Sequence, residues 1–185
     1  MTARARLVGK LLIAHCTCAS VHLTCLPIAN MEMPAAGFGI GLDEITEWFE
    51  QEPAPEAFDV AAGRIPKGGV AAVRFQVTGM AGGRPVLVVD HTTRLRPGLR
   101  PDWPQPAQPG GSYRVEITGE PSYVVDVCPA SAKGDHNYAA IASGAGRAVN
   151  AIPDVVAAEP GIRTILDLPF GTANGVFATT LGNAG

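Results

Sequence analysis

Two stretches near the middle of the chain alternate apolar and polar residues, and each predicts a strand. Within residues 70–78, apolar and polar residues take turns from position 73 onward, with the period of two that a half-buried strand requires. Residues 85–95 repeat this pattern, with His91 on the apolar face and with Asp90 and Arg94 on the other. A Met-Ala-Gly-Gly turn separates the two stretches. We therefore expect a hairpin in which a cross-strand or diagonal ion pair accounts for Asp90 and Arg94.

A second hairpin is predicted after a segment that cannot form regular structure. Residues 96–111 contain five prolines and three glycines, so we expect a surface loop there, pinned by Trp103. Residues 113–118 and 123–128 then alternate around a turn at 119–122. These segments add two further strands.

The segment before the first hairpin shows the spacing of an amphipathic helix. In residues 42–52, Leu42, Ile45 and Phe49 recur at helical intervals. Asp43 suits the first turn of such a helix, where negative charge is favourable. We therefore expect a short helix over residues 42–52.

A longer helix is predicted after the second hairpin. Asp135 is suited to cap its N-terminus, and Pro153 breaks or restarts it. Its apolar stripe is made of residues three or four apart: Tyr138, Ile141, Ala145, Val149 and Ile152. The order helix, two strands, loop, two strands, helix predicts an α+β domain, with an antiparallel or mixed β-sheet and helices packed on one face.

The glycine-rich residues 37–41, GFGIG, imitate a dinucleotide-binding loop. The fingerprint of that loop is G-x-G-x-x-G between a buried strand and a helix. Here the third glycine comes one residue early, and the preceding residues 30–34 are not β-branched. We therefore expect a simple turn, with no cofactor-binding site and no Rossmann domain in this chain.

Composition and charge argue against several kinds of partner. The net charge is −3, and no lysine and arginine cluster is dense enough for nucleic acid. The chain also lacks the roughly 20 mostly apolar residues that span a membrane. Four cysteines are too few for a disulfide framework in 185 residues, which favours a reduced, cytoplasmic setting.

Residues 1–33 do not fit the rest of the chain. Their basic start imitates a signal peptide, but polar residues interrupt the apolar run. The possible zinc ligands lack the second, separated ligand pair of a structural site; they are His15, Cys16, Cys18, His22 and Cys25. We expect a poorly ordered or mis-started segment without a metal site, then a domain over residues 34–172 and a flexible tail over 173–185.

Short motifs between residues 34 and 170 are similar to one protein family. The most specific are RAVNAIP at 147–153 and PGI at 160–162, joined by PDWP at 101–104 and YRVEITGEP at 113–121. Together they resemble the C-terminal domain of NAD(P)-dependent oxidoreductases of the dihydrodipicolinate-reductase-like and 2,4-diaminopentanoate-dehydrogenase-like group. The resemblance implies a substrate-side and oligomerisation domain that follows a cofactor domain.

For the full-length family, the resemblance implies hydride transfer between NAD(P) and a carbon–nitrogen bond of a small amine or amino-acid-like substrate. This chain departs from dihydrodipicolinate reductases, which carry a His-His-x-x-Lys element, because its histidines are isolated: His15, His22, His91 and His136. We therefore expect no dihydrodipicolinate reduction, and no activity without a cofactor domain. The expected protein partner is a second copy or a separate cofactor-domain chain.

Four residues are candidates for contacting a substrate, and no catalytic residue is assigned. Arg64 precedes the first strand and suits a bidentate carboxylate contact, although an exposed arginine beside a turn explains it as well. His91 is either a substrate contact or a satisfied core histidine. Arg147 and Asn150 lie on one side of the long helix, and Asn150 also suits the backbone groups freed before Pro153.

Two functions of different classes remain open. The first is the C-terminal domain of an amine-dehydrogenase-like oxidoreductase, separated from its cofactor half. The second is a non-catalytic binding or interaction domain that kept the fold and lost the chemistry. A cofactor domain supplied by another chain favours the first, and stable folding without any response to cofactor favours the second.

Overall fold

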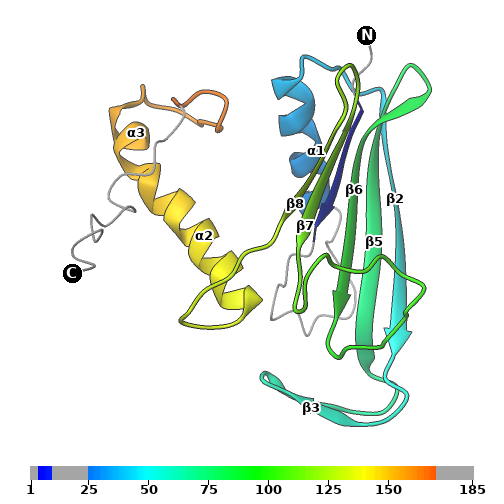
Figure 1. Cartoon of the computed structure of the whole chain (residues 1–185). Coiled ribbons are helices and arrows are strands. Elements are labelled where there is room, and N and C mark those ends of the chain that lie inside the picture. The colour runs from blue at the N-terminus through cyan, green and yellow to red at the C-terminus, as the bar shows by residue number, and fades with distance from the viewer. Residues whose placement is uncertain (1–3, 10–24, 170–185) are drawn as a thin grey trace, which may run out of the picture. The chain divides into compact units, whose positions relative to one another are not determined.

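The computed structural model describes residues 4–9 and 25–169 of the chain (Figure 1). It divides into two compact units, Met1–Ala130 and Ser131–Gly185. The first, the sheet unit, is built on a β-sheet. The second, the helical unit, is built on two helices.

A mixed sheet of six strands forms the sheet unit, in the order β2-β5-β6-β1-β7-β8. Neighbouring strands are antiparallel, except that β1 runs parallel to β6. The strands are β1 (Arg4–Gly9), β2 (Glu44–Pro53), β5 (Val70–Ala81), β6 (Arg84–Arg94), β7 (Tyr113–Thr118) and β8 (Tyr123–Val127). A separate pair, β3 (Phe58–Val60) and β4 (Gly63–Ile65), forms a small second sheet. The predicted α+β class with a mixed sheet is confirmed.

Helix α1 (Cys25–Gly37) packs on one face of the large sheet (Figure 1). Met31 and Ala35 of this helix are 1% and 2% exposed, and they lie against Val77 of β5 and Leu87 of β6. Burying a side chain the size of methionine, valine or leucine stabilises the fold by about 1.5–3 kcal/mol. This contact therefore forms one of the two apolar cores of the sheet unit.

The proline-rich segment after β6 is a loop, as predicted, and an arginine and a tryptophan hold it in place. Trp103 is 2% exposed and packs in a second cluster with Leu99 and with small residues of β5. The Arg94 guanidinium donates to the carbonyl oxygens of Leu99, Arg100 and Pro104 at 2.7, 3.0 and 3.1 Å. Burial lowers the pKa of Arg94, and the three carbonyls take up the donors that water would otherwise solvate.

The helix predicted over residues 42–52 is wrong, because this segment is strand β2. It pairs antiparallel with β5 from Glu44 opposite Met80 onward. Ile45 and Phe49 are four residues apart, so they share a face in a strand as well as in a helix. Glu47 lies between them on that face and hides the alternation.

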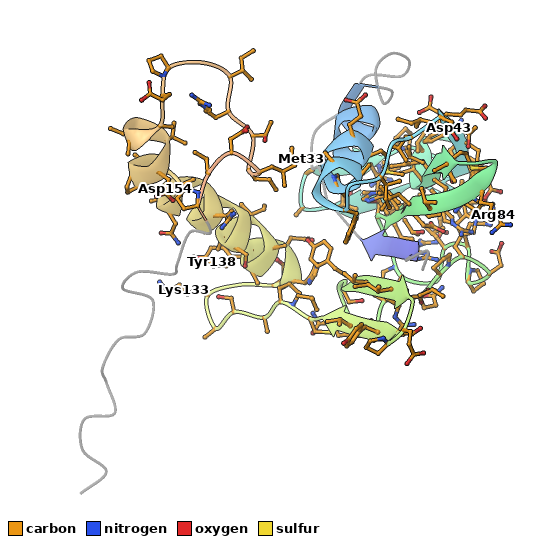
Figure 2. The ribbon with its side chains drawn as sticks, turned by 90° about the horizontal axis from the view of Figure 1, so that it is seen from above. Met33, Asp43, Arg84, Lys133, Tyr138 and Asp154 are labelled. Atoms are coloured by element: carbon orange, nitrogen blue, oxygen red, sulfur yellow. The ribbon has the colours of Figure 1, made fainter. Side chains whose placement is uncertain are left out.

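The glycine turn at residues 37–41 joins the end of α1 to β2. The order helix, turn, strand is the reverse of the dinucleotide fingerprint. Asp43, predicted in a helical first turn, instead accepts a hydrogen bond from the Gly82 amide at the tip of the β5–β6 hairpin, to which it lies close (Figure 2). Gly82 and Gly83 have φ angles of +56° and +69°, as a two-residue hairpin turn of the favoured kind requires.

The N-terminal segment contributes to the sheet unit. Strand β1 lies between β6 and β7, and α1 crosses the boundary expected between residues 33 and 34 and carries Met31 into the core. The possible zinc ligands from His15 to His22 lie outside the described residues, as does the expected tail at 173–185.

The helical unit contains α2 (His136–Asn150) and α3 (Ile152–Ala157). Asp135 caps α2 as predicted, since its carboxylate accepts a hydrogen bond from the Tyr138 amide at 3.0 Å. The predicted break is also present, with Pro153 in the first turn of α3. Within residues 4–9 and 25–169, no helix has the length and apolar character needed to cross a membrane.

The loop anchor leads to a stability prediction. Substituting Arg94→Met should lower the free energy of unfolding by about 2–4 kcal/mol, because three carbonyl groups lose a charged donor. Urea unfolding followed by circular dichroism measures the change. The control is Arg64→Met, whose pair with Asp59 has side chains 65% and 74% exposed and should change stability by less than about 1 kcal/mol. Equal effects of the two substitutions would contradict the anchoring role.

Candidate functional site

The sheet face opposite α1 is charged. Side chains alternate along each strand, so the neighbours of core residue Val77 point to the opposite face. Strand pairing aligns polar and aromatic side chains from five strands on that face: Trp48, Arg74, Gln76, Asp90, Arg114 and Asp126. This charged face is the part of the sheet unit with the functional groups to bind a polar ligand.

A buried ion pair lies at the centre of the charged face. The Arg74 guanidinium donates to both carboxylate oxygens of Asp90, Nε at 3.1 Å and Nη2 at 2.7 Å. The Asp90 side chain is fully buried and that of Arg74 is 19% exposed. The hydrogen bond to Asp90 is the main cause that raises the pKa of Arg74. The ion pair predicted for Asp90 is confirmed, with Arg74 of the neighbouring strand as its diagonal partner. The ion pair predicted for Arg94 is wrong, because its guanidinium donates to loop carbonyls.

Trp48 extends this pair toward the surface. The Arg74 guanidinium lies 5.2 Å from the centre of the indole ring, within the range of a cation–π contact. The indole N–H donates to the Gln76 side-chain oxygen at 2.9 Å. Trp48 is 40% exposed, so it offers solvent an aromatic surface beside the ion pair.

Three carboxylates surround a second arginine, Arg100, whose guanidinium lies 4.5 Å from the centre of the Trp103 ring. Arg100 binds Asp102 at 2.8 Å and lies 3.4 and 3.6 Å from Glu50 and Glu52 of β2. Its hydrogen bonds lower the pKa of Asp102 and raise its own. Three negative groups against one positive group leave surplus negative charge, and Glu50 lies two residues from Trp48 on the same face of β2. Such an arrangement favours an organic cation, because carboxylates and aromatic faces both attract ammonium groups.

A third ion pair lies at the end of the charged face. Arg114 of β7 donates to both oxygens of Asp126 of β8 at 2.8 and 2.7 Å. Its geometry matches that of the Arg74–Asp90 pair, but both side chains are partly exposed. The Arg114 hydrogen bond lowers the pKa of Asp126.

The two predicted site residues of the sheet unit lie in different sheets. Arg64 is in β4 and pairs with Asp59 at 3.2 Å, with both side chains exposed. His91 is in β6 on the α1 side, where its ring stacks on Phe75 at 4.7 Å and Nε2 lies 2.7 Å from the Thr93 hydroxyl. The structure therefore gives both residues local partners and does not join them in one site.

The other two predicted site residues, Arg147 and Asn150, lie in the last turn of α2. The N-cap residue of the following helix α3 is Ala151, and the capping role of Asn150 stays a prediction. Among the described residues, no group of His, Cys, Asp or Glu is arranged to hold a metal ion.

Sequence reasoning missed the partners of the charged face. The alternation of β5 already placed Arg74 and Gln76 together on a polar face. Trp48 and Glu50 were assigned to a helix, however, and the loop around Arg100 had no predicted path. The sequence signal for this strand was the presence of four glutamates within residues 44–53, because charged side chains are typical of a strand at the edge of a sheet.

The two bidentate pairs allow a matched test of burial. Arg74→Met should reduce the free energy of unfolding by about 3 kcal/mol, because the buried Asp90 carboxylate loses its guanidinium. Arg114→Met removes the same geometry from an exposed carboxylate and should have a much smaller effect. Thermal and urea unfolding of both variants measures the difference. If Arg114→Met were as damaging as Arg74→Met, burial would not be the deciding factor.

The exposed pair also predicts a pH effect. Arg114 lowers the pKa of Asp126 in the folded state, so the pair stabilises the fold above the unfolded pKa of about 3.9. That contribution disappears as the pH falls through the lower, folded pKa. In NMR titration, the Asp126 carboxyl should titrate below pH 3.9, and Arg114→Met should move its midpoint upward. An unchanged midpoint would show that Arg114 does not set it.

Known proteins are similar to this chain in sequence or in fold. The family model of the 2,4-diaminopentanoate dehydrogenase C-terminal domain matches residues 27–179. An amine dehydrogenase from Streptomyces virginiae is 36% identical over 149 residues, which cover 79% of this chain and 41% of that protein. The solved amine dehydrogenase from Mycobacterium smegmatis has a TM-score of 0.56 at 18% identity, over 92% of this chain and 52% of that one.

The chain therefore spans 41% of the length of the curated relative. The matched region begins within α1 and extends past the boundaries predicted at residues 34 and 172. The resemblance inferred from the short motifs is confirmed. The chain belongs to the family of the 2,4-diaminopentanoate dehydrogenase C-terminal domain.

Proposed function

We propose that this chain is the substrate-side and oligomerisation domain of an NAD(P)-dependent dehydrogenase that acts on a small amine. The observation that carries the proposal is the surplus of carboxylates around Arg100, two of which share a face of β2 with the partly exposed Trp48. An amine substrate is an ammonium ion at neutral pH. Glu50 and Glu52 would attract that charge, and Trp48 would cover its alkyl part.

The proposed cofactor is NAD(P), and the described residues do not fit it. Binding the pyrophosphate of a dinucleotide requires a glycine loop between a strand and a helix N-terminus. Here the glycine loop follows α1 and leads into β2. We therefore assign the cofactor to a separate domain, which supplies the hydride acceptor, and assign substrate binding to this one. The chain alone is expected to be inactive.

Arg64, His91, Arg147 and Asn150 stay predictions for substrate contacts. Arg64 and His91 would have to give up their present partners, Asp59 and Thr93, to bind a substrate group.

A cytoplasmic location is likewise a proposal, based on the sparse cysteines and on Cys128, which is free and exposed. The alternative function, a non-catalytic interaction domain, is favoured by the lack of a cofactor loop within the described residues.

A chimera tests the proposed function. The matched part of the Streptomyces virginiae amine dehydrogenase is replaced by this chain, and NAD(P)H formation is followed with a set of small primary amines. We expect turnover by the chimera. Titration calorimetry of this chain alone should show a dissociation constant for NADH and NADPH weaker than about 100 μM, which is roughly −5.5 kcal/mol.

Matched carboxylate variants test the site within the chimera. Glu50→Gln should raise KM for the amine about tenfold, equal to about 1.4 kcal/mol of lost attraction, with a smaller change in kcat. Glu47→Gln is the control, because Glu47 lies on the same strand but on the opposite face. A folded chimera without turnover, together with no response of this chain to cofactor, would instead support the interaction-domain function.

A further inference from the structure

Strand β8 is an end strand of the large sheet with an apolar, exposed surface. No strand of the described chain pairs with its outer side, so one side of its backbone lacks a β-ladder. Its apolar side chains are exposed on both faces of the sheet: Tyr123 by 54%, Val124 by 66%, Val125 by 47% and Val127 by 47%. An apolar strand with an unpaired edge is a template for adding another strand.

The opposite edge of the same sheet is protected. Strand β2 carries a charge at almost every second or third position and ends in Pro53. Its charged residues are Glu44, Glu47, Glu50 and Glu52. Like charges opposite one another disfavour pairing between two copies of this edge, and edge strands commonly use charge and proline for that purpose. The sheet is therefore protected at one edge and open at the other.

The single charge of β8 is already compensated within the chain. Arg114 of β7 holds the Asp126 carboxylate through two hydrogen bonds of 2.8 and 2.7 Å. Because Arg114 neutralises Asp126, β8 carries no unpaired charge that would repel the same strand of a second copy.

We infer that β8 pairs with β8 of a second copy of this chain, antiparallel and centred on Val125. This inference rests on the oligomerisation role proposed above and names its surface. In this register, Val125 faces its own copy across the two-fold axis and Tyr123 faces Val127, so apolar side chains meet. Asp126 faces Val124. A parallel, in-register pairing would instead place Asp126 opposite the same aspartate, which like charge disfavours.

This pairing satisfies two requirements at once. The outer N–H and C=O groups of β8 gain the partners that the described chain does not provide. The two six-stranded sheets become one continuous sheet, in which the exposed valines on each face gain apolar neighbours from the partner strand. Because a two-fold contact uses the same patch on both partners, one substitution changes the interface twice.

The test measures self-association of the full chain by sedimentation equilibrium. We expect the wild-type chain to dimerise. Val125→Lys should raise the dissociation constant at least about tenfold, because it places two like charges opposite each other. Phe49→Lys is the matched control, since Phe49 is 50% exposed on the protected edge strand β2, and it should leave the dissociation constant within about twofold.

Charge reversal separates interface effects from misfolding. Val125→Glu alone should also weaken association, whereas an equimolar mixture of the Val125→Lys and Val125→Glu chains should restore dimers, because opposite charges then meet across the axis. A wild-type chain that stays monomeric at about 100 μM, a Val125→Lys chain that still dimerises, or a mixture that does not recover would each overturn the inference.

Turnover of the chimera reports separately on the proposed enzyme function. A monomeric chimera that turns over would overturn the β8 interface and leave the enzyme function standing. A β8-dependent dimer without turnover would support the interface and remove the enzyme function.

Discussion

The pairing of β5 with β6 is the constraint on which the rest of the sheet unit depends. Its two-residue glycine turn and the register shift between Gly79 and Met80 together set the pairing, and the period of two then assigns the side chains beyond that shift to a face. Val77 and Leu87 point toward α1 and build the core, while Arg74 and Asp90 meet on the other face. A shift of one residue in either strand would exchange the core for the charged face.

Burial determines how much each charged contact contributes. The Arg74–Asp90 and Arg114–Asp126 pairs have nearly the same bidentate geometry, but Asp90 is withdrawn from water and Asp126 is not. Removing one partner of the inner pair leaves a buried charge without its guanidinium, whereas water replaces the lost partner in the outer pair. The Arg74–Asp90 pair therefore matters most for the stability of the fold, whereas the Arg114–Asp126 pair mainly neutralises the charge of the edge strand β8.

The loop after β6 connects stability to the proposed substrate surface. Arg94 and Trp103 hold the backbone of this loop against the sheet. The same loop carries Arg100, whose guanidinium meets the glutamates of β2. Arg94 and Trp103 do not belong to the negative surface, but they fix the position of the loop that carries Arg100 and therefore the place where that surface forms.

Sequence alone determined the elements whose patterns are local. The alternation of residues 73–78, the turn glycines, the prolines of the loop and the Asp135 cap each predicted what the structure shows, and short motifs identified the family. The charged face was only half predicted. Arg74 and Asp90 were placed on polar faces and an ion pair was predicted for Asp90, but its partner was not named, and Trp48 was assigned to a helix.

Tertiary structure decided what depends on strand pairing. Ile45 and Phe49 fit a helix and a strand equally well by spacing, and only the β5 neighbour selects the strand. Likewise, no local pattern states which strand ends the sheet, so the difference between the open edge at β8 and the protected edge at β2 appears only in the assembled order. The physical reason is that hydrogen bonds of a strand lie between segments distant in sequence, whereas those of a helix, a turn or a cap lie within one segment.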